Sequence, residues 1–226
     1  MATVAKPEST TDVEGDQLVV FEGVEWGGYN SVLKLRGARG LPKVVYLDGR
    51  LTLMSPSYIH ERLKKLLGSF IEIALEGLGI RFVAAGSTTL RRRRRKGGVE
   101  GDETYYLKNL ADLRGKTRID LRVDAPPDLA VEVVVSHDAD DAVEVYRRLG
   151  VPEVWVSSEE RMIFLTLGED GAYAPAAESR AVPGLTPSEV HSWITRDDFP
   201  DDFEWRRVLR RWVDEELAPR REEEIP

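Results

Sequence analysis

The sequence predicts a mixed α/β (α+β) domain in which helices flank a mixed β-sheet, and three patterns indicate this class. An apolar, β-branched run at residues 128–135 precedes a helical pattern at 139–149 and a second apolar run at 154–156, as expected of a β-α-β unit with parallel strands. Short extended runs separated by glycines at residues 81–107 favour a strand meander. An amphipathic helical stripe lies near the end of the chain.

Composition limits the function classes. The 226 residues are 42% hydrophobic and include no cysteine, so a real core is expected and disulfides, thiolate zinc sites and a cysteine nucleophile are excluded. The net charge of -8 argues against a protein that binds nucleic acid by overall charge alone, but an enzyme acting on nucleic acid needs only a local basic surface. The absence of a long apolar run and of a secretory signal favours a cytoplasmic protein without a membrane partner.

The expected organisation is one domain with two flanking segments. Residues 1–15 are small and polar and are expected to form a flexible lead-in. Residues 16–195 carry the α/β patterns and form the domain. Residues 196–226 are expected to form a C-terminal helical extension, whose apolar stripe must cover either the core or a partner.

The first elements of the domain are an N-terminal hairpin and a helix. Apolar runs at 44–47 and 51–54 flank Asp48-Gly49, a dipeptide that suits a two-residue hairpin turn. Ser55 or Ser57 can cap the following helix. The residues that share the apolar face of this helix are Ile59, Leu63, Leu66, Leu67, Phe70 and Ala74.

Extended segments follow the helix. Residues 81–85, 87–94 and 104–107 are expected to be strands of the meander, and residues 128–135 are expected to be a central strand buried on both faces. Residues 162–167 pair with the segment around Tyr173 as a peripheral hairpin. Helices at 187–193 and at about 203–217 complete the expected order.

Two groups of carboxylates stand out. Glu132 lies in the middle of the buried strand, where period-two alternation places Asp128 on the same face, and two carboxylates on one strand suggest a metal site. The alternative is that Glu132 is ion-paired with an arginine such as Arg122 or Arg147. Another acidic group enters the preceding strand in the segment GGVEGDETYYL, and it is well placed to share an ion with Glu132.

A basic run, Arg91, Arg92, Arg93, Arg94, Arg95 and Lys96, precedes that acidic segment. Strand alternation would divide these side chains between two faces, so a charged edge strand is one interpretation. The other is binding to the DNA backbone, which the position of the run next to the acidic segment favours.

Several motifs occur in an order that resembles a known family. They are His60-Glu61 after GRLTLMSPS, then GSTTL, GVEGDETYYL, PPDLAVEV and finally YRRLGVPEVW. This order is similar to the Uma family of restriction endonucleases, within the PD-(D/E)XK nuclease superfamily, from about residue 24 to residue 193. PPDLAVEV and GVPEVW in that order are its most specific parts.

The resemblance implies a restriction-endonuclease-like mixed sheet flanked by helices and a metal-dependent DNA endonuclease that hydrolyses phosphodiester bonds. Its Mg²⁺ or Mn²⁺ site would consist of Asp102, at the family's Glu-Pro-Asp position, of Glu132 and of the main-chain carbonyl of Val133. Glu61 would be an auxiliary acidic residue and Asp128 a secondary one. The sequence departs from the family in carrying Gly101 in place of the proline.

A second departure concerns a lysine of the superfamily. Val134 and Ala142 occupy the two positions at which relatives carry it. Because Lys116 is the last lysine of the chain, any substitute must come from upstream or be an arginine. A catalytically impaired DNA-binding or interaction module with the same fold therefore stays open as an alternative, as does the choice between a monomer and a homodimer.

Overall fold

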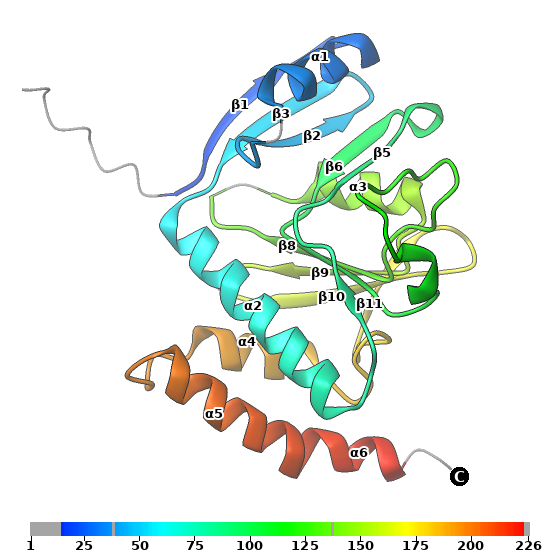
Figure 1. Ribbon diagram of the computed structural model, residues 1–226. Helices are drawn as coiled ribbons and strands as arrows, with labels where there is room; N and C mark the ends of the chain where they lie inside the picture. Colours follow the sequence, from blue (N-terminus) through cyan, green and yellow to red (C-terminus); the bar gives the residue numbers. More distant parts are fainter. Residues whose placement is uncertain (1–14, 38, 137, 224–226) are drawn as a thin grey trace, which may run out of the picture.

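The computed structural model describes residues 15–37, 39–136 and 138–223, so most of the expected lead-in lies outside the described residues. Two β-sheets form the body of the protein (Figure 1). The strands of the first sheet, in spatial order, are β1 (Gln17–Phe21), β3 (Arg50–Ser55), β2 (Lys43–Leu47), β6 (Gly97–Glu100) and β5 (Thr89–Arg92). All their pairings are antiparallel.

The second sheet has six strands. Its order is β11 (Tyr173–Ala176), β10 (Met162–Leu167), β9 (Glu153–Ser157), β8 (Leu129–Val133), β7 (Glu103–Tyr106) and β4 (Val83–Ala84). β8 and β9 pair in parallel, and the other neighbours pair antiparallel. The crossover between β8 and β9 is helix α3 (Asp140–Leu149), which confirms the predicted β-α-β unit.

The remaining helices surround these sheets. α1 (Trp26–Arg36) lies over the first sheet, and α2 (Tyr58–Gly77) runs along the second sheet beside α4 (Pro187–Thr195) and α5 (Asp202–Trp212) (Figure 1). The chain continues from α5 through a π-helical turn at Val213–Leu217 into α6 (Ala218–Glu223). Two short 3₁₀ turns occur at Arg93–Arg95 (η1) and Leu110–Leu113 (η2).

Local sequence signals account for the N-terminal elements that were predicted. Asp48 and Gly49 have φ angles of 48° and 101°, as the tight turn between β2 and β3 requires. The side chain of Ser57 accepts a hydrogen bond from the His60 amide at 3.2 Å, so Ser57 caps α2. The hairpin and the helix are therefore confirmed.

The predicted meander differs from the structure in its pairing. Its strands do not form one sheet, because β5 pairs with β6 in the first sheet whereas β4 and β7 belong to the second. β6 is the glycine-containing segment between the predicted strands, and the arginine run leaves the strand after Arg92. β1 and α1 were also not predicted, since α1 has a glycine pair in its first turn and a weak apolar face.

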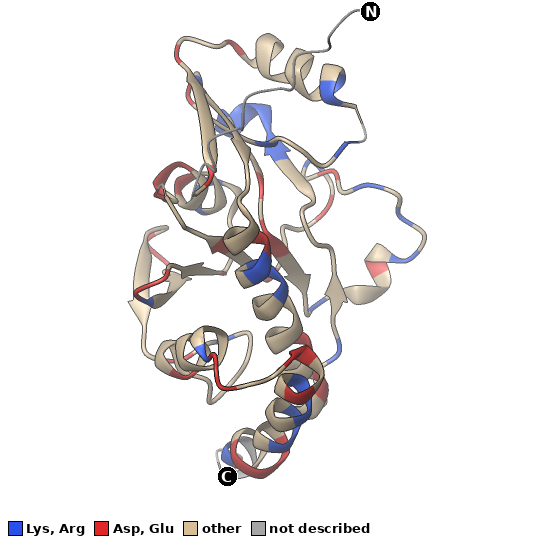
Figure 2. Ribbon diagram, turned by 90° about the vertical axis from the view of Figure 1, so that its left-hand side faces the viewer, with Lys and Arg blue, Asp and Glu red and all other residues tan. Residues whose placement is uncertain are grey.

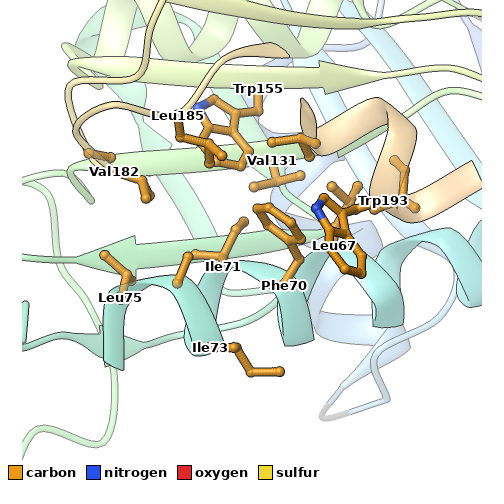
Figure 3. Packing of buried hydrophobic residues seen from close by; sticks show 14 of the residues in the cluster. Leu67, Phe70, Ile71, Ile73, Leu75, Val131, Trp155, Val182, Leu185 and Trp193 are labelled. Atoms are coloured by element: carbon orange, nitrogen blue, oxygen red, sulfur yellow. The ribbon is translucent and has the colours of Figure 1, made fainter. Parts of the chain in front are cut away.

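The main core lies between α2, the second sheet and the C-terminal helices. Leu67, Phe70 and Ile71 on α2 face Val131 and Trp155 on β8 and β9 (Figure 3). Complete burial of such side chains stabilises the fold by about 1.5–3 kcal/mol each. Trp205 and Leu209 on α5 are buried in the same cluster. The apolar stripe of the C-terminal extension therefore covers the core.

A second core joins the two sheets. Val145 and Tyr146 on α3 pack with Leu90 and Val99 of the first sheet and with Val154 of the second. α3 thus fixes the position of one sheet relative to the other. Within the described part of the chain, no helix combines the length and the hydropathy needed to cross a membrane.

Candidate active site

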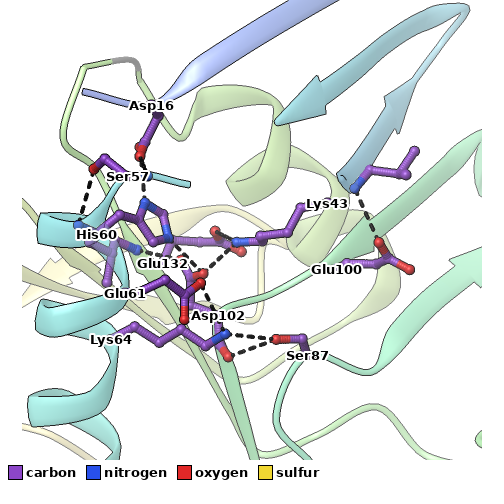
Figure 4. A network of polar contacts seen from close by, with 12 residues as sticks. Asp16, Lys43, Ser57, His60, Glu61, Lys64, Ser87, Glu100, Asp102 and Glu132 are labelled. Atoms are coloured by element: carbon purple, nitrogen blue, oxygen red, sulfur yellow. Dashed lines mark hydrogen bonds and ion pairs between the residues drawn. The ribbon is translucent and has the colours of Figure 1, made fainter. Parts of the chain in front are cut away.

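A buried polar cluster occupies the junction of the two sheets (Figure 4). Asp102 lies between β6 and β7, Glu132 lies on β8, Lys43 begins β2, and His60 lies in the first turn of α2. Side chains from both sheets and from the longest helix of the domain therefore meet at one point.

Backbone contacts hold Asp102 against the central strand. Its amide donates to the carbonyl of Val131 at 3.1 Å, and its Oδ2 accepts a hydrogen bond from the Val133 amide at 2.8 Å. Asp102 is fully buried. The predicted proximity of Asp102, Glu132 and Val133 is therefore present, and the contact from Val133 is made through its amide.

Lys43 joins the two carboxylates. Its ammonium nitrogen lies 2.6 Å from Asp102 Oδ1 and 3.6 Å from Glu132 Oε2, and the residue is only 4% exposed. Burial alone would lower the pKa of Lys43, but Glu132 and Asp102 outweigh it and raise that pKa. The side chain is therefore a buried cation shared by two acids.

Glu132 has one further partner. The hydroxyl of Tyr146 on α3 donates to Glu132 Oε1 at 2.6 Å. Burial raises the pKa of Glu132 to about 7, with Lys43 opposing the shift. The arginine alternative considered for this carboxylate is wrong, because Arg122 pairs with Asp120 and Arg147 pairs with Glu144.

His60 connects Asp102 to the start of β1. Its Nε2 lies 2.9 Å from Asp102 Oδ1, and its Nδ1 lies 2.9 Å from Asp16 Oδ2. Asp16 Oδ1 also accepts the amide hydrogen of Ser57, the cap of α2. Burial opposes a charge on His60, but the contact with Asp102 dominates and raises the pKa of the ring.

The ionised form of Asp102 is favoured by the same neighbours. Burial by itself would raise the pKa of this carboxyl. The positive charge of Lys43 and the hydrogen bond from His60 outweigh burial and hold the pKa well below its usual range. Asp102 is therefore ionised in this environment, whereas Glu132 titrates near neutrality.

The other predicted acidic residues have different positions. Asp128 Oδ2 accepts the amide hydrogens of Leu107 and Lys108 at 2.8 and 3.0 Å, so this carboxylate stabilises the chain after β7. Glu100 pairs with Arg36 of α1 and accepts the amide hydrogen of Val44. Of the acidic residues in the segment before β7, Asp102 is the one that contacts Lys43.

Glu61 belongs to an outer rim of the cluster. Its side chain is 43% exposed and lies 3.7 Å from the amine of Lys64. Lys64 in turn contacts the hydroxyl of Ser87, which donates to the main-chain carbonyl of Asp102 at 3.2 Å (Figure 4). The structure thus places Glu61 beside the buried cluster, on its solvent side.

The arginine run spans the end of β5 and the turn of the β5–β6 hairpin, and it appears as a continuous basic segment in Figure 2. Five of its six side chains are exposed, and Arg92 is half-buried. β6 runs from this turn toward Asp102, so at about 3.3 Å per residue the turn lies up to about 20 Å from that carboxylate. The run therefore lies mostly on the surface, joined to the buried cluster by β6.

Three residues of the cluster have roles that the sequence patterns did not predict. Lys43 precedes an apolar strand and carries no motif, although the lack of any lysine after Lys116 did require an upstream candidate. Asp16 lies at the edge of a polar segment, and Tyr146 is one of several tyrosines in apolar surroundings. No local signal distinguishes them, because their partners in the cluster are at least 14 residues away along the chain.

The donor set fits a hard divalent cation. The carboxylates of Asp102 and Glu132 already share one positive group, and oxygen donors are those that Mg²⁺ and Mn²⁺ prefer. Among the described residues, no group of three or more His, Cys, Asp or Glu side chains is arranged to hold a metal. Such an ion would therefore depend on two carboxylates, main-chain oxygen and water.

The chain has a restriction-endonuclease-like fold, with a parallel β-α-β unit in a mixed sheet and two carboxylates at the sheet junction. A crystal structure of a putative nuclease belonging to DUF820 from Anabaena variabilis is similar, with a TM-score of 0.53 and 12% sequence identity over 73% of this chain and 97% of that one. The model of the Uma2 family, described as putative restriction endonuclease, matches residues 30–197, and the chain belongs to this family. No curated protein matches the sequence.

Proposed function

We propose that the protein is a metal-dependent nuclease that hydrolyses phosphodiester bonds in DNA. The observation that carries this proposal is the convergence of Asp102, Glu132 and Lys43 at one buried point. Family membership and the fold support the same reaction class. Two acids and an amine in a water-poor site can hold a cation and a phosphate group together.

Asp102 and Glu132 are the proposed ligands of Mg²⁺ or Mn²⁺, with the carbonyl of Val133 as a third donor. When bound, such an ion polarises the scissile phosphate and lowers the pKa of water. The hydrogen bonds from Val133 and His60 orient the Asp102 carboxylate, and the Tyr146 hydroxyl orients Glu132. Glu61 is proposed as an auxiliary acid at the rim.

Lys43 is proposed to take the place of the superfamily lysine, whose two usual positions are occupied here by Val134 and Ala142. Its ammonium is already at the two carboxylates, although it reaches them from the other sheet. An ammonium there can stabilise negative charge on a phosphate oxygen during hydrolysis. A flexible lysine side chain can change partner without movement of the backbone.

The proposed DNA contacts include the basic run at the end of β5 and in the following turn, which comprises Arg91, Arg92, Arg93, Arg94, Arg95 and Lys96. Basic side chains on an otherwise acidic protein give a local surface for phosphates. The turn lies at most about 20 Å from Asp102 along β6, which is less than the roughly 34 Å of one duplex turn. One duplex can therefore contact both places.

The proposal is tested by cleavage of supercoiled plasmid with Mg²⁺ or Mn²⁺, compared with a chelator. Asp102→Ala and Glu132→Ala are expected to abolish nicking. Glu103→Gln is the matched control, because this neighbouring half-buried carboxylate lies against Gly68 of α2. Salt-sensitive DNA binding without any metal-dependent cleavage would contradict the enzyme and favour the binding module.

A further inference from the structure

We infer that Lys43 is an internal counterion that competes with the divalent cation for Asp102 and Glu132 and is released to a substrate phosphate, so that metal and substrate bind cooperatively. This inference rests on the proposed nuclease function and concerns the regulation of the same site.

The first observation is that the Lys43 ammonium occupies the space between the two proposed metal ligands. The ammonium of Lys43 lies 2.6 Å from Asp102 and 3.6 Å from Glu132, which puts it between the two proposed metal ligands. Figure 4 shows the Lys43 side chain extending from β2 toward these acids. A divalent ion bound to the same oxygens would lie within a few ångströms of the ammonium, and like charges at that separation repel strongly in a buried site.

The second observation is that the carboxylates already have partners. Asp102 Oδ1 contacts both Lys43 and His60, and Asp102 Oδ2 accepts the Val133 amide hydrogen. Glu132 Oε1 accepts the hydroxyl hydrogen of Tyr146. A metal held by these two carboxylates would therefore have to replace the ammonium of Lys43, because the acidic site is already satisfied.

The third observation concerns where the ammonium can go. A buried lysine needs an anion, and the nearby Glu100 is already paired with Arg36 through two contacts. A phosphate group of the substrate is an anion that arrives at the same point in the proposed reaction. Transfer of Lys43 to that phosphate frees both carboxylates for the metal.

The consequence is a thermodynamic coupling. Metal binding without substrate is weakened by the displacement of Lys43, and substrate phosphate removes that penalty. By linkage, metal strengthens substrate binding by the same factor. Removal of the ammonium should therefore strengthen metal binding and abolish the coupling.

The test uses Mn²⁺ alone, titrated calorimetrically into the full-length protein. Lys43→Met is expected to bind Mn²⁺ more tightly than the wild type, by a factor of about 5 to 150, the usual range for coupled sites. Lys65→Met removes the same charge from an exposed position on α2 and is expected to change the affinity by less than about threefold, because exposed charges are screened. Equal affinity of Lys43→Met and the wild type would overturn the inference.

A second titration contains a phosphorothioate duplex, which resists cleavage. The duplex is expected to tighten Mn²⁺ binding to the wild type and to leave that of Lys43→Met unchanged. An equal effect of the duplex on both proteins would contradict the coupling. If plasmid cleavage persists in that case, the nuclease proposal stands, whereas absence of Mn²⁺ binding and of cleavage in every protein would remove the proposed function itself.

A measurement on the wild type covers the case in which Lys43→Met does not fold. The ammonium resonance of Lys43 in ¹⁵N-labelled protein can be assigned by its loss in Lys43→Arg. Addition of Mg²⁺ is expected to shift or broaden this resonance, because the ammonium leaves its carboxylate partners. An unchanged resonance at saturating Mg²⁺ would overturn the inference.

Discussion

The hydroxyl of Tyr146 occupies the space into which a side chain at Gly101 would project. The same hydroxyl donates to Glu132 at 2.6 Å, and Gly101 immediately precedes Asp102. The geometry of both proposed metal ligands thus depends on one small residue. This contact gives a physical reason for glycine where the family pattern has proline, because proline also carries a Cβ atom.

Gly101→Ala should therefore damage the site and the fold together. The new methyl group clashes with the Tyr146 hydroxyl, and overpacking of this kind costs about 1–3 kcal/mol of unfolding free energy. Urea denaturation measures this loss, and plasmid cleavage should fall with it. Adding Tyr146→Phe removes the clashing oxygen, so the double variant should be more stable than Gly101→Ala alone. If the changes in unfolding free energy caused by the two single substitutions simply added in the double variant, the contact between Gly101 and Tyr146 would be refuted.

Asp16→Asn is expected to weaken the link between β1, α2 and Asp102. The substitution removes a charge partner of His60 and weakens the acceptor for the Ser57 amide, so the unfolding free energy should fall by about 1–3 kcal/mol. Plasmid cleavage should also fall, because His60 is then less firmly held against Asp102. Ser57→Ala removes only the helix cap and is the control. If Ser57→Ala lowers cleavage per folded molecule as much as Asp16→Asn does, the role assigned to Asp16 is wrong.

Replacement of Arg93, Arg94 and Arg95 by alanine should weaken DNA binding without loss of stability, because these side chains are exposed. The slope of log Kd against log salt should fall by about one for each phosphate that the variant no longer neutralises. Fluorescence anisotropy over a salt series measures this slope. Alanine at Arg207, Arg210 and Arg211, which are exposed on α5, is the matched triple control. An equal decrease in the salt slope for the two triple variants would contradict a specific role of the turn and indicate nonspecific attraction to DNA.

The metal-free protein should lose stability as the pH rises from about 4.5 to about 7 through the titration of Glu132. The pKa of this carboxyl is about 7 in the folded protein against its ordinary value of 4.5, so within this interval the folded state holds a proton that the unfolded state has released. The free energy of unfolding then falls with increasing pH. Urea titrations in the presence of a chelator measure the trend. Glu132→Gln should flatten it, and an unchanged slope in this variant would show that Glu132 does not titrate there.

Lys43→Gln should lower plasmid cleavage at saturating metal by about 10² to 10³, the usual effect of removing one electrostatic contact to the transition state. Metal must be saturating, so that a change in metal affinity does not mask the loss. Lys65→Gln, on the same helix as His60, is the control. Cleavage by Lys43→Gln at the wild-type rate would exclude a role of this amine in the reaction.

Short-range patterns were sufficient for much of the fold. The hairpin turn at Asp48-Gly49, the capped helix α2 and the β8-α3-β9 unit all depend on residues that are close together in the sequence. Hydrophobic periodicity and turn residues were therefore enough to predict them. The family, expected from the order of motifs, and the fold class are confirmed by the family model and the similar crystal structure. The division of the meander between two sheets could not be predicted from the sequence, because hydrophobic periodicity does not identify which strands pair with one another.

The sequence by itself singled out Glu132 as a buried acid, its family resemblance added Asp102, and the position of Lys116 as the last lysine required any lysine of the site to come from upstream. Only the tertiary structure shows that Lys43 is the lysine in contact with these acids, that Asp16 and His60 continue the cluster, and that Asp128 instead accepts backbone hydrogen bonds after β7. The physical reason is that a buried charge selects its partner by proximity in the packed core. α3 and α2 bring the two sheets and the start of β1 together, and that packing places Lys43 beside an acid 59 residues away along the chain.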